Sequence, residues 1–218
     1  MPSEDQQDVL DQLEIRVLAV LSEKEATTPD AYPLSLNALT NGCNQLSSRD
    51  PVMSLSDDAV HDVVQRLMQR KLVAEVSQAG ARVAKFEHRM RIKWTLEPDK
   101  LAVLTVLMLR GSQTAGEIRA RCERLHAFES IEQVEACLQF LIDKYPPLVA
   151  KLARGRYAQL LAGESFVEQQ EIASAFSGKV RVEGGTDRLS QLEAEVIQLR
   201  AGLDDLSAQF ALFKQQFD

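Results

Sequence analysis

Basic and amide side chains gather between residues 56 and 93, and their types could support binding to nucleic acid. Gln and Arg side chains can hydrogen-bond the edges of adenine and guanine, whereas Lys and Arg neutralise phosphates. The candidates for base contacts recur on one predicted helix and are Gln65, Arg66, Gln69 and Arg70. The candidates for phosphate contacts follow further along the chain and are Arg82, Lys85, Arg89, Arg91 and Lys93. This pattern predicts duplex DNA as a ligand; the alternative for the basic run is a solvated strand edge that discourages sheet pairing.

Three carboxylates oppose base reading at the start of the same helix. Asp57, Asp58 and Asp62 cluster near its N-terminus, the end that often enters the major groove, and there they would repel phosphates. Between Arg82 and Lys93, by contrast, Glu87 is the single acidic residue. We therefore expect the basic run, rather than the helix, to make the DNA contact.

Catalytic and metal chemistry have no comparable support in the sequence. The three histidines lie on separate predicted elements, with no recurring carboxylate or cysteine spacing beside them, at His61, His88 and His126. The three cysteines are odd in number and lack C-x-x-C spacing, and the chain has no Gly-rich phosphate loop. We predict no enzymatic activity, no cofactor and no metal site, and we expect the cysteines to be small buried hydrophobic residues.

A second candidate surface lies upstream, around a loop with two prolines. After this Thr27 to Pro33 loop, Asn37, Asn41 and Asn44 recur four and three residues apart, so they share one face of a helix. Amides at this spacing could bind a partner strand or a base edge. The alternative, which we favour, is that these polar residues hydrogen-bond the irregular loops on either side. The residues concerned are Tyr32, Asn44, Gln45 and Arg49.

The helix that carries the base-reading candidates has a continuous apolar face, followed by a predicted hairpin. Ser56 can cap this helix, and its apolar residues at helical spacing are Val60, Val63, Val64, Leu67, Met68 and Leu72. Two extended runs then flank the turn-forming triplet Gln78-Ala79-Gly80, and they cover Val73 to Ser77 and Arg82 to Phe86.

Two earlier helices complete this first unit. One begins at Leu10 and ends near Lys24 to Ala26. Ser35 caps the next, and its predicted buried stripe is Leu36, Leu39, Cys43 and Leu46. Three helices followed by a hairpin are the order of a winged helix-turn-helix domain, which uses its third helix and its wing to contact DNA.

The same order of elements recurs in the next part of the chain. A strongly apolar helix ends at Gly111, Thr114 caps a second helix, and a third runs from Ile131 to Tyr145. Two short strands follow, from Leu148 to Leu152 and from Arg156 to Leu161. Two copies of one order predict a tandem winged-helix protein. Each unit is small, so we expect the two to pack together.

The third helix of the second unit is acidic on its exposed face. Its polar residues are Glu132, Gln133, Glu135, Gln139, Asp143 and Lys144. The basic residues of this unit lie instead on its second helix and are Arg119, Arg121 and Arg124. We interpret this unit as a packing or partner-binding module rather than a base reader.

The C-terminal segment has an unbroken heptad pattern, which is typical of a coiled coil. The seam consists of Leu189, Leu192, Val196, Leu199, Leu203, Leu206, Phe210, Phe213 and Phe217. In a parallel pair of chains Arg188 would face Glu193 and Glu195 would face Arg200, and both pairs attract. The pattern predicts a parallel homodimer; the alternative is that this helix packs on its own domains.

Composition sets the remaining bounds. The formal net charge of the 218-residue chain is −7, which counts against a protein whose whole surface binds nucleic acid. Met1 to Gln7 are polar, and no run approaches the roughly 20 apolar residues of a membrane span, so we predict a cytoplasmic protein without membrane contact.

The predicted fold class is mainly α with small β-hairpins, that is α+β. The predicted organisation is a disordered lead-in (1–8), winged-helix domains (9–97 and 98–162), a flexible linker (163–186) and a coiled-coil helix (187–218).

Several motifs of the chain resemble the signature of the YceH-like family of bacterial proteins. In order they are Thr27 to Leu39, Cys43 to Gln45, Arg49 to Val52, Leu109 to Thr114, Lys151 to Arg154, and Arg156-Tyr157. The resemblance spans about residues 10 to 162 and implies a tandem winged-helix protein. The family commonly has Lys where this chain has Leu46, and a longer basic turn where this chain has Arg154-Gly155-Arg156. Both differences remove positive charge, and the shorter turn makes DNA binding by the second unit less expected.

Two functions follow as expectations. The first is a dimeric, DNA-associated regulator of the transcription type, in which the first wing contacts phosphates and the coiled coil pairs two chains. The second is a protein-binding winged-helix scaffold with no direct DNA contact, which the net charge and the acidic helix faces favour.

Overall fold

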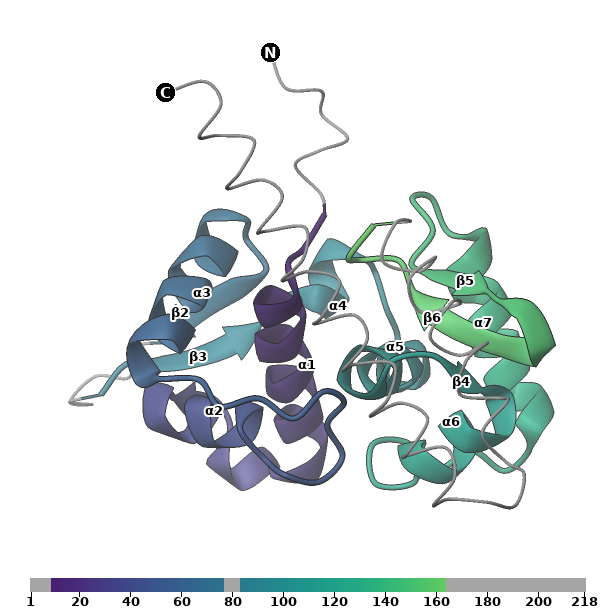
Figure 1. Cartoon of the computed structure of the whole chain (residues 1–218), viewed down its shortest axis with the longest axis horizontal. Coiled ribbons are helices and arrows are strands. Elements are labelled where there is room, and N and C mark those ends of the chain that lie inside the picture. The colour runs from purple at the N-terminus through teal and green to yellow at the C-terminus, as the bar shows by residue number, and fades with distance from the viewer. Residues whose placement is uncertain (1–8, 77–82, 164–218) are drawn as a thin grey trace, which may run out of the picture. The chain divides into compact units, whose positions relative to one another are not determined.

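The structure is a computed structural model that describes residues 9–76 and 83–163 (Figure 1). Arg82 and the predicted lead-in, linker and coiled coil lie outside the described residues, apart from Gly163 at the start of the linker. Residues 9–163 fall within one compact unit of the chain.

The first half contains three helices and a small antiparallel sheet. Helix α1 (Gln12–Thr27) leads through a short 3₁₀ turn, η2 (Pro29–Ala31), into strand β1 (Leu34–Ser35) and helix α2 (Leu36–Cys43). Helix α3 (Asp57–Gln69) and strands β2 (Val73–Val76) and β3 (Lys85–His88) follow. The strand order is β1-β3-β2, so the first strand pairs with the last.

The second half repeats this order after a short connecting helix, α4 (Met90–Lys93). It consists of α5 (Pro98–Arg110), β4 (Gln113–Thr114), α6 (Ala115–Cys122), α7 (Ile131–Asp143), β5 (Val149–Lys151), the 3₁₀ turn η3 (Ala153–Gly155) and β6 (Arg156–Gln159). Its strand order, β4-β6-β5, matches that of the first sheet. The prediction of an α+β fold is confirmed.

Local sequence explains where several of these helices begin and end. Asp11 and Glu14 form a reciprocal capping box at the start of α1, and Thr114 and Glu117 do the same for α6. Gly111 ends α5 with a positive φ of 71°, a conformation that glycine adopts without a steric penalty. Ser35 and Ser56 cap α2 and α3 through their side chains.

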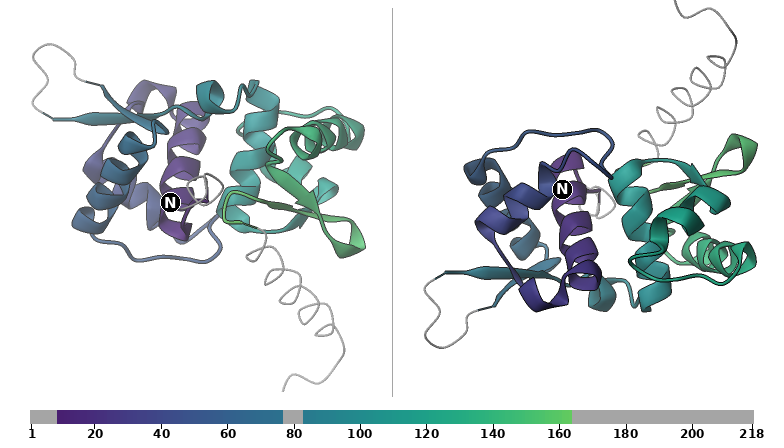
Figure 2. Two further views of the ribbon diagram at one scale, coloured as in Figure 1. Left: turned by 90° about the horizontal axis from the view of Figure 1, so that it is seen from above. Right: turned by 90° about the horizontal axis from the view of Figure 1, so that it is seen from below.

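Helices α1 and α5 lie side by side and join the two halves (Figure 2). Both are buried around most of their circumference, and their apolar residues belong to one continuous core. One polar contact crosses this core, because the Ser22 and Thr105 hydroxyls are 2.7 Å apart and both residues are buried. The two halves therefore share a core rather than having one each.

Several element boundaries differ from the sequence prediction. Helix α2 ends at Cys43, so Leu46 does not extend its buried stripe and is 85% exposed. Helix α7 ends at Asp143, and Tyr145 beyond it is 96% exposed. The second strand of the first hairpin runs from Lys85 to His88 rather than from Arg82 to Phe86.

Candidate macromolecule-binding surface

The exposed face of α3 combines three carboxylates with amides and a histidine. The solvent-exposed residues of this helix are Asp57, Asp58, His61, Asp62, Gln65, Arg66 and Gln69. The Gln65 amide nitrogen lies 3.3 Å from His61 Nε2, so this pair forms one polar surface along the helix. The opposite face, with Val60, Val63, Val64 and Leu67, is buried.

Both arginines among the base-reading candidates make ion pairs with the start of α1. Arg66 lies 2.7 Å from Asp11 Oδ2 and 3.5 Å from Glu14 Oε1. Arg70 lies 2.9 Å from Glu14 Oε2 and also donates to the Val9 carbonyl. Glu14 is 4% exposed, so this carboxylate needs cationic partners for its own burial. The structure therefore places both arginines against α1, at the edge of the exposed face.

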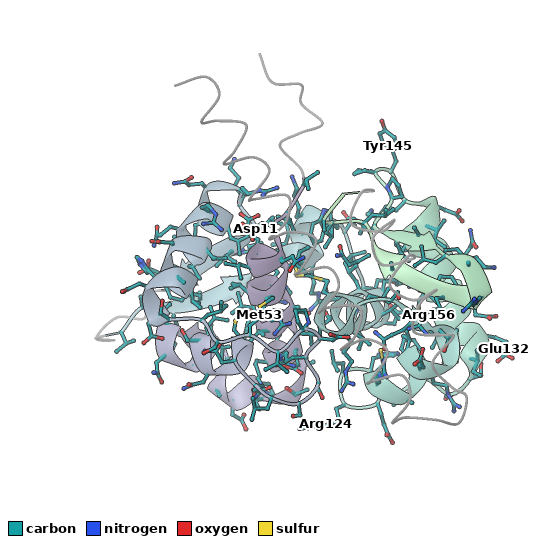
Figure 3. All side chains as sticks on the ribbon, viewed as in Figure 1. Asp11, Met53, Arg124, Glu132, Tyr145 and Arg156 are labelled. Atoms are coloured by element: carbon teal, nitrogen blue, oxygen red, sulfur yellow. The ribbon has the colours of Figure 1, made fainter. Side chains whose placement is uncertain are left out.

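Helix α7 presents an equivalent face in the second half. Glu132, Gln139 and Asp143 lie along its exposed side, and the Gln139 amide donates to Asp143 at 2.8 Å. Lys144 lies over the Phe140 ring at 5.8 Å, at the edge of this face. Figure 3 shows Glu132 and Tyr145 projecting from the ribbon. The acidic character predicted from the sequence thus coincides with an exposed surface.

The basic run after the first hairpin is divided between two elements. Lys85 is half-buried in β3, where it pairs in register with Ser35 and Val76. Arg89 follows the strand and makes an ion pair with Glu87 at 2.8 Å. Arg91 and Lys93 lie on α4, which the sequence analysis did not predict, and both are exposed.

Two buried arginines hold the C-terminal end of α2 and the loop after it. Arg16 donates to the carbonyls of Cys43, at 3.1 Å, and Pro51. Arg49 donates to the Gly42 carbonyl and makes an ion pair with Glu23 at 2.6 Å. Helix C-termini carry unpaired carbonyls and partial negative charge, which explains why cations are placed here. Burial lowers the pKa of Arg16 from its ordinary value, and the nearby Arg49 acts in the same direction.

The other family-motif residues also make contacts within the chain. The Asn44 side chain both donates to and accepts from the backbone of Leu55, at 2.8 Å each, and Gln45 accepts from Arg49 at 2.7 Å. The Tyr32 hydroxyl accepts from the His88 backbone at 2.8 Å. Asn37 and Asn41 are exposed and hydrogen-bond one another at 3.1 Å. Tyr32, Asn44, Gln45 and Arg49 therefore order loops, whereas Asn37 and Asn41 belong to the surface.

Sequence reasoning missed a buried histidine contact beside the connector α4. The His88 side chain is buried, its Nδ1 accepts from the Met90 backbone, and its Nε2–H donates to Glu25 Oε2 at 3.0 Å. This hydrogen bond from His88 lowers the pKa of the Glu25 carboxyl from its ordinary value. Phe86 and His88 alternate inward on β3. This alternation was the signal in the sequence from which the burial of His88 could have been predicted.

The cysteines of the chain are buried and make no disulfide. Burial raises the pKa of the Cys43 and Cys122 thiols to about 12, so both are protonated at neutral pH and unsuited to nucleophilic chemistry. Across residues 9–76 and 83–163, no group of three or more His, Cys, Asp or Glu side chains could hold a metal ion. The helices in the same ranges are all too short or too polar to cross a membrane.

These observations define a class of protein: an α+β protein with two similar halves, one shared core and two acidic helix faces. Residues 10–157 match the family described as "Protein of unknown function, DUF480". The UPF0502 protein of Janthinobacterium sp. (strain Marseille) is 63% identical over 217 residues, which cover 96% of this chain and 92% of that protein. That of Herminiimonas arsenicoxydans is 59% identical over 218 residues, with 97% and 92% covered. The chain belongs to this DUF480/UPF0502 family, and the resemblance to a bacterial family is confirmed.

Proposed function

We propose that the chain is a non-enzymatic tandem winged-helix protein that works by binding another protein. The order of elements in each half supports winged-helix domains, with three helices followed by a hairpin whose last strand also pairs with the strand before the second helix. In this assignment α3 and α7 are the third helices, and the hairpins β2–β3 and β5–β6 are the wings.

A single observation carries the choice of partner: the centre of the exposed face of both third helices has no cation. In α3 the centre consists of Asp58, Asp62 and Gln65, and in α7 it consists of Glu132, Gln139 and Asp143. The cations at the edges of these faces, Arg66, Arg70 and Lys144, all contact other groups of the chain. A helix that enters the major groove of DNA needs a positively charged face, because negatively charged phosphates line both sides of the groove. An acidic face with amides suits a basic segment of a protein.

The test is copurification from a bacterium that expresses the tagged full chain. Wild type is compared with Asp58→Lys/Asp62→Lys on α3 and with Glu132→Lys/Glu135→Lys on α7. We expect one stoichiometric protein partner with wild type and at least a tenfold lower affinity with one of the reversed faces. Like charges across an interface cost several kcal/mol, and about 1.4 kcal/mol already corresponds to tenfold.

The matched control is Asp30→Lys, which makes the same change at an exposed position in η2. Recovery of the partner must be unchanged with this control. A partner recovered equally with all variants, or no stoichiometric partner together with tight duplex binding at low salt, contradicts the proposal.

DNA binding remains a second candidate because of the cations around the first wing. Arg91 and Lys93 are exposed on α4, close in sequence to Lys85 in β3. These residues could contact phosphates without α3 entering a groove. The test measures fluorescence anisotropy of labelled duplex DNA at rising salt for wild type and for a variant with Gln at residues 82, 85, 89 and 91. Binding that weakens both with salt and in the variant supports this function, whereas affinity that responds to neither excludes it.

Dimerisation through the heptad seam of residues 189–217 is part of the same proposal. A pair of chains would present two copies of each acidic face and so strengthen a weak contact through effective concentration. Sedimentation equilibrium of the full chain and of a chain ending at residue 186 tests it. A dimer that becomes a monomer on truncation is expected, and an unchanged oligomeric state is the contrary result.

A further inference from the structure

A cleft of about 480 Å³ opens beside the connector α4, and we call it the connector cleft. Its lining comes from the end of α1, the end of β3, α4 itself and the segment that leads into α5. In Figure 2, α4 lies between α1 and α5, where the chain passes from the first half to the second. Small-molecule sites typically have volumes of roughly 300–1,000 Å³ and favour the junctions between domains.

Two opposite charges line the connector cleft without forming an ion pair with one another. They are the carboxylate of Glu25 and the guanidinium of Arg91, which is exposed and makes no ion pair within the described part of the chain. The hydrogen bond from His88 lowers the pKa of the Glu25 carboxyl, and the charge of Arg91 acts in the same direction. Glu25 is therefore anionic at neutral pH. The other charged side chains of the lining are already in ion pairs, which are Arg89–Glu87 and Glu97–Lys100.

The Glu25 carboxylate is held in place through one of its two oxygens. His88 Nε2–H donates to Oε2 at 3.0 Å, and His88 is itself fixed because its Nδ1 accepts from the Met90 backbone N–H at 3.3 Å. The Oε1 atom accepts no hydrogen bond from residues 9–76 or 83–163, and the side chain is 39% exposed. Glu25 thus presents a preorganised acceptor to the cleft, which limits the entropy lost when a cation binds.

Thr95 lines the same cleft in a conformation that β-branched residues rarely adopt. Its φ is 50°, in the left-handed region. The Leu96 N–H donates to the Arg91 carbonyl at 3.1 Å, so Thr95 occupies the position after a helix end at which glycine is preferred. Strained residues are concentrated at binding sites, where the side chain itself is used. The hydroxyl of Thr95 is the group that glycine would lack.

The cleft also has apolar surface for a short aliphatic group. Ile92 is 70% exposed on α4, and Leu96 is buried beside it in the lining. A single exposed isoleucine is ordinary on a protein surface. Here it shares one cleft with the two unmatched charges, so a ligand that meets both charges can also cover apolar area.

We propose that the connector cleft binds a small aliphatic α-amino acid as its zwitterion. The ammonium group binds Glu25, the carboxylate binds Arg91 and the Thr95 hydroxyl, and the side chain covers Ile92. Such a ligand satisfies two opposite charges that the protein holds apart, which neither a simple amine nor a simple carboxylic acid does. The site does not depend on whether other surfaces of the chain bind protein or DNA.

The first experiment is an NMR titration of the isotope-labelled full chain with L-leucine. We expect saturable shifts that are largest for the backbone amides of residues 87–97. Each half of the ligand is a control: 3-methylbutylamine lacks the carboxylate, and 4-methylpentanoate lacks the ammonium group. Both should bind at least about fivefold more weakly than leucine, because each loses one charge-assisted contact.

Three substitutions assign the contacts. Arg91→Gln should weaken leucine about fivefold to tenfold and leave 3-methylbutylamine unchanged, because the amine has no carboxylate. Glu25→Gln should weaken leucine by a similar factor and leave 4-methylpentanoate unchanged. Thr95→Gly relieves the strained φ, so it should not lower the urea midpoint of unfolding, but it should weaken leucine at least about twofold.

Arg124→Gln is the matched control, because Arg124 is an exposed cation that does not line this cleft. Its affinity for leucine should equal that of wild type, and circular dichroism checks that each variant is folded. The proposal is overturned if leucine gives no saturable shifts at millimolar concentration, or if either half of the ligand binds as tightly as leucine. It is also overturned if Arg124→Gln and Arg91→Gln weaken leucine equally.

Discussion

Gly42 lies where α2 packs against α1 with no room for a side chain. A Cβ at this position would be 2.5 Å from Val20 Cγ1, and Val20 is fully buried. Since Val20 is held by the shared core, the strain must be taken up by the two helices. We expect Gly42→Ala to lower the free energy of unfolding by about 1–3 kcal/mol, as overpacking commonly does. Urea denaturation followed by Trp94 fluorescence measures this loss.

Gly116→Ala is the control for this substitution. Gly116 is also helical, in α6, but a Cβ there would meet no atom within 4 Å. The alanine should leave stability unchanged or raise it by up to about 1 kcal/mol, because alanine favours helix. Equal losses at both positions would contradict the packing argument.

Arg49 is the residue on which the loop after α2 depends. Its side chain is completely buried, and its ion pair with Glu23 lies beside the bonds to the Gly42 carbonyl. Removing one member of a buried pair leaves the other uncompensated, at a cost of about 3–5 kcal/mol. We therefore expect Arg49→Met to destabilise the protein strongly in thermal and urea unfolding.

A double variant separates the ion pair from the other bonds of Arg49. In Glu23→Met/Arg49→Met neither member of this pair remains without the other, and Lys24, which contacts Glu23 at 3.6 Å, is partly exposed, so part of the lost stability should return. A double variant whose loss equals the sum of both single losses would show that the pair itself has no coupling energy.

At the scale of residues, the sequence predicted candidate binding side chains but not the groups within the chain that they contact. Arg66 and Arg70 were candidates for base contacts from their position on the helix alone. Their carboxylate partners, Asp11 and Glu14, lie on another helix 55 and 56 residues upstream. Periodicity within one helix carries no information about such a pair. The loop-ordering alternative for Asn44 and Arg49 was within reach, because irregular backbone always needs polar partners.

At the scale of elements, the contact between His88 and Glu25 links the end of α1 to β3 and α4. The hydrogen bond from His88 keeps the pKa of Glu25 below its ordinary value of 4.5. A carboxyl whose pKa is depressed in the folded state contributes stability at pH values above its unfolded pKa and loses it as the pH falls through the folded value. We expect the free energy of unfolding to fall as the pH drops from about 5.5 to 3.5, and Glu25→Gln to make this fall shallower.

Urea denaturation at a series of pH values measures this slope, and His88→Gln provides an independent check. Glu25→Gln removes the titrating carboxyl and His88→Gln removes the imidazole that lowers its pKa, so both should reduce the slope, and the double variant should resemble Glu25→Gln alone. If the free energy of unfolding of Glu25→Gln falls with pH as steeply as that of wild type, this contact is excluded as a source of acid sensitivity.

The ends of helices and strands were predictable where local apolar periodicity determines them. They were not predictable where contacts with residues distant in the sequence determine them. Helix α1, the start of α3 and the end of α5 lie close to the predicted residues because caps and stripes coincide there, whereas α3 ends at Gln69, before Leu72 of its predicted stripe. Helix α2 ends before Leu46, where Arg16 and Arg49 bind its last carbonyls. The shift of β3 has a similar cause, since its pairing with β1 brings Phe86 opposite Leu34.

At the scale of the whole molecule, the contact between α1 and α5 makes the two halves depend on one another. Thr105→Val keeps the shape of the side chain but leaves the buried Ser22 hydroxyl without this partner. We expect a loss of about 1–3 kcal/mol, the cost of an unsatisfied buried polar group. Hydrogen exchange should then increase in α3 and α7 alike, because both belong to one core.

Ser22→Ala/Thr105→Val is the control, since it removes both hydroxyls and leaves no polar group unpaired. It should be more stable than Thr105→Val alone. Faster exchange confined to α5 and its own half would indicate two separately stable domains rather than one.

The overall fold could be predicted from the sequence better than the features of the protein surface. The repeated order of elements predicted the α+β class, and the small size of each unit predicted that they pack together. A cleft of about 520 Å³ lies where the two halves meet. Its position was not predictable, because its lining residues Gln69, Trp94 and Leu161 come from three separate segments that only the folded chain brings together.

The Leu10 backbone N–H donates to the Leu161 carbonyl at 2.7 Å, and this hydrogen bond has a consequence for chain connectivity. Val9 lies beside Gly163, where a Cβ would be 3.6 Å from Val9 Cγ1, so the described body begins and ends at one place. Such a body can be circularly permuted: a short linker from residue 163 to residue 9 would close it into a ring, and new ends could be opened in the loop between α6 and α7. The shared core therefore requires both halves, but it does not require the order in which they follow one another along the chain.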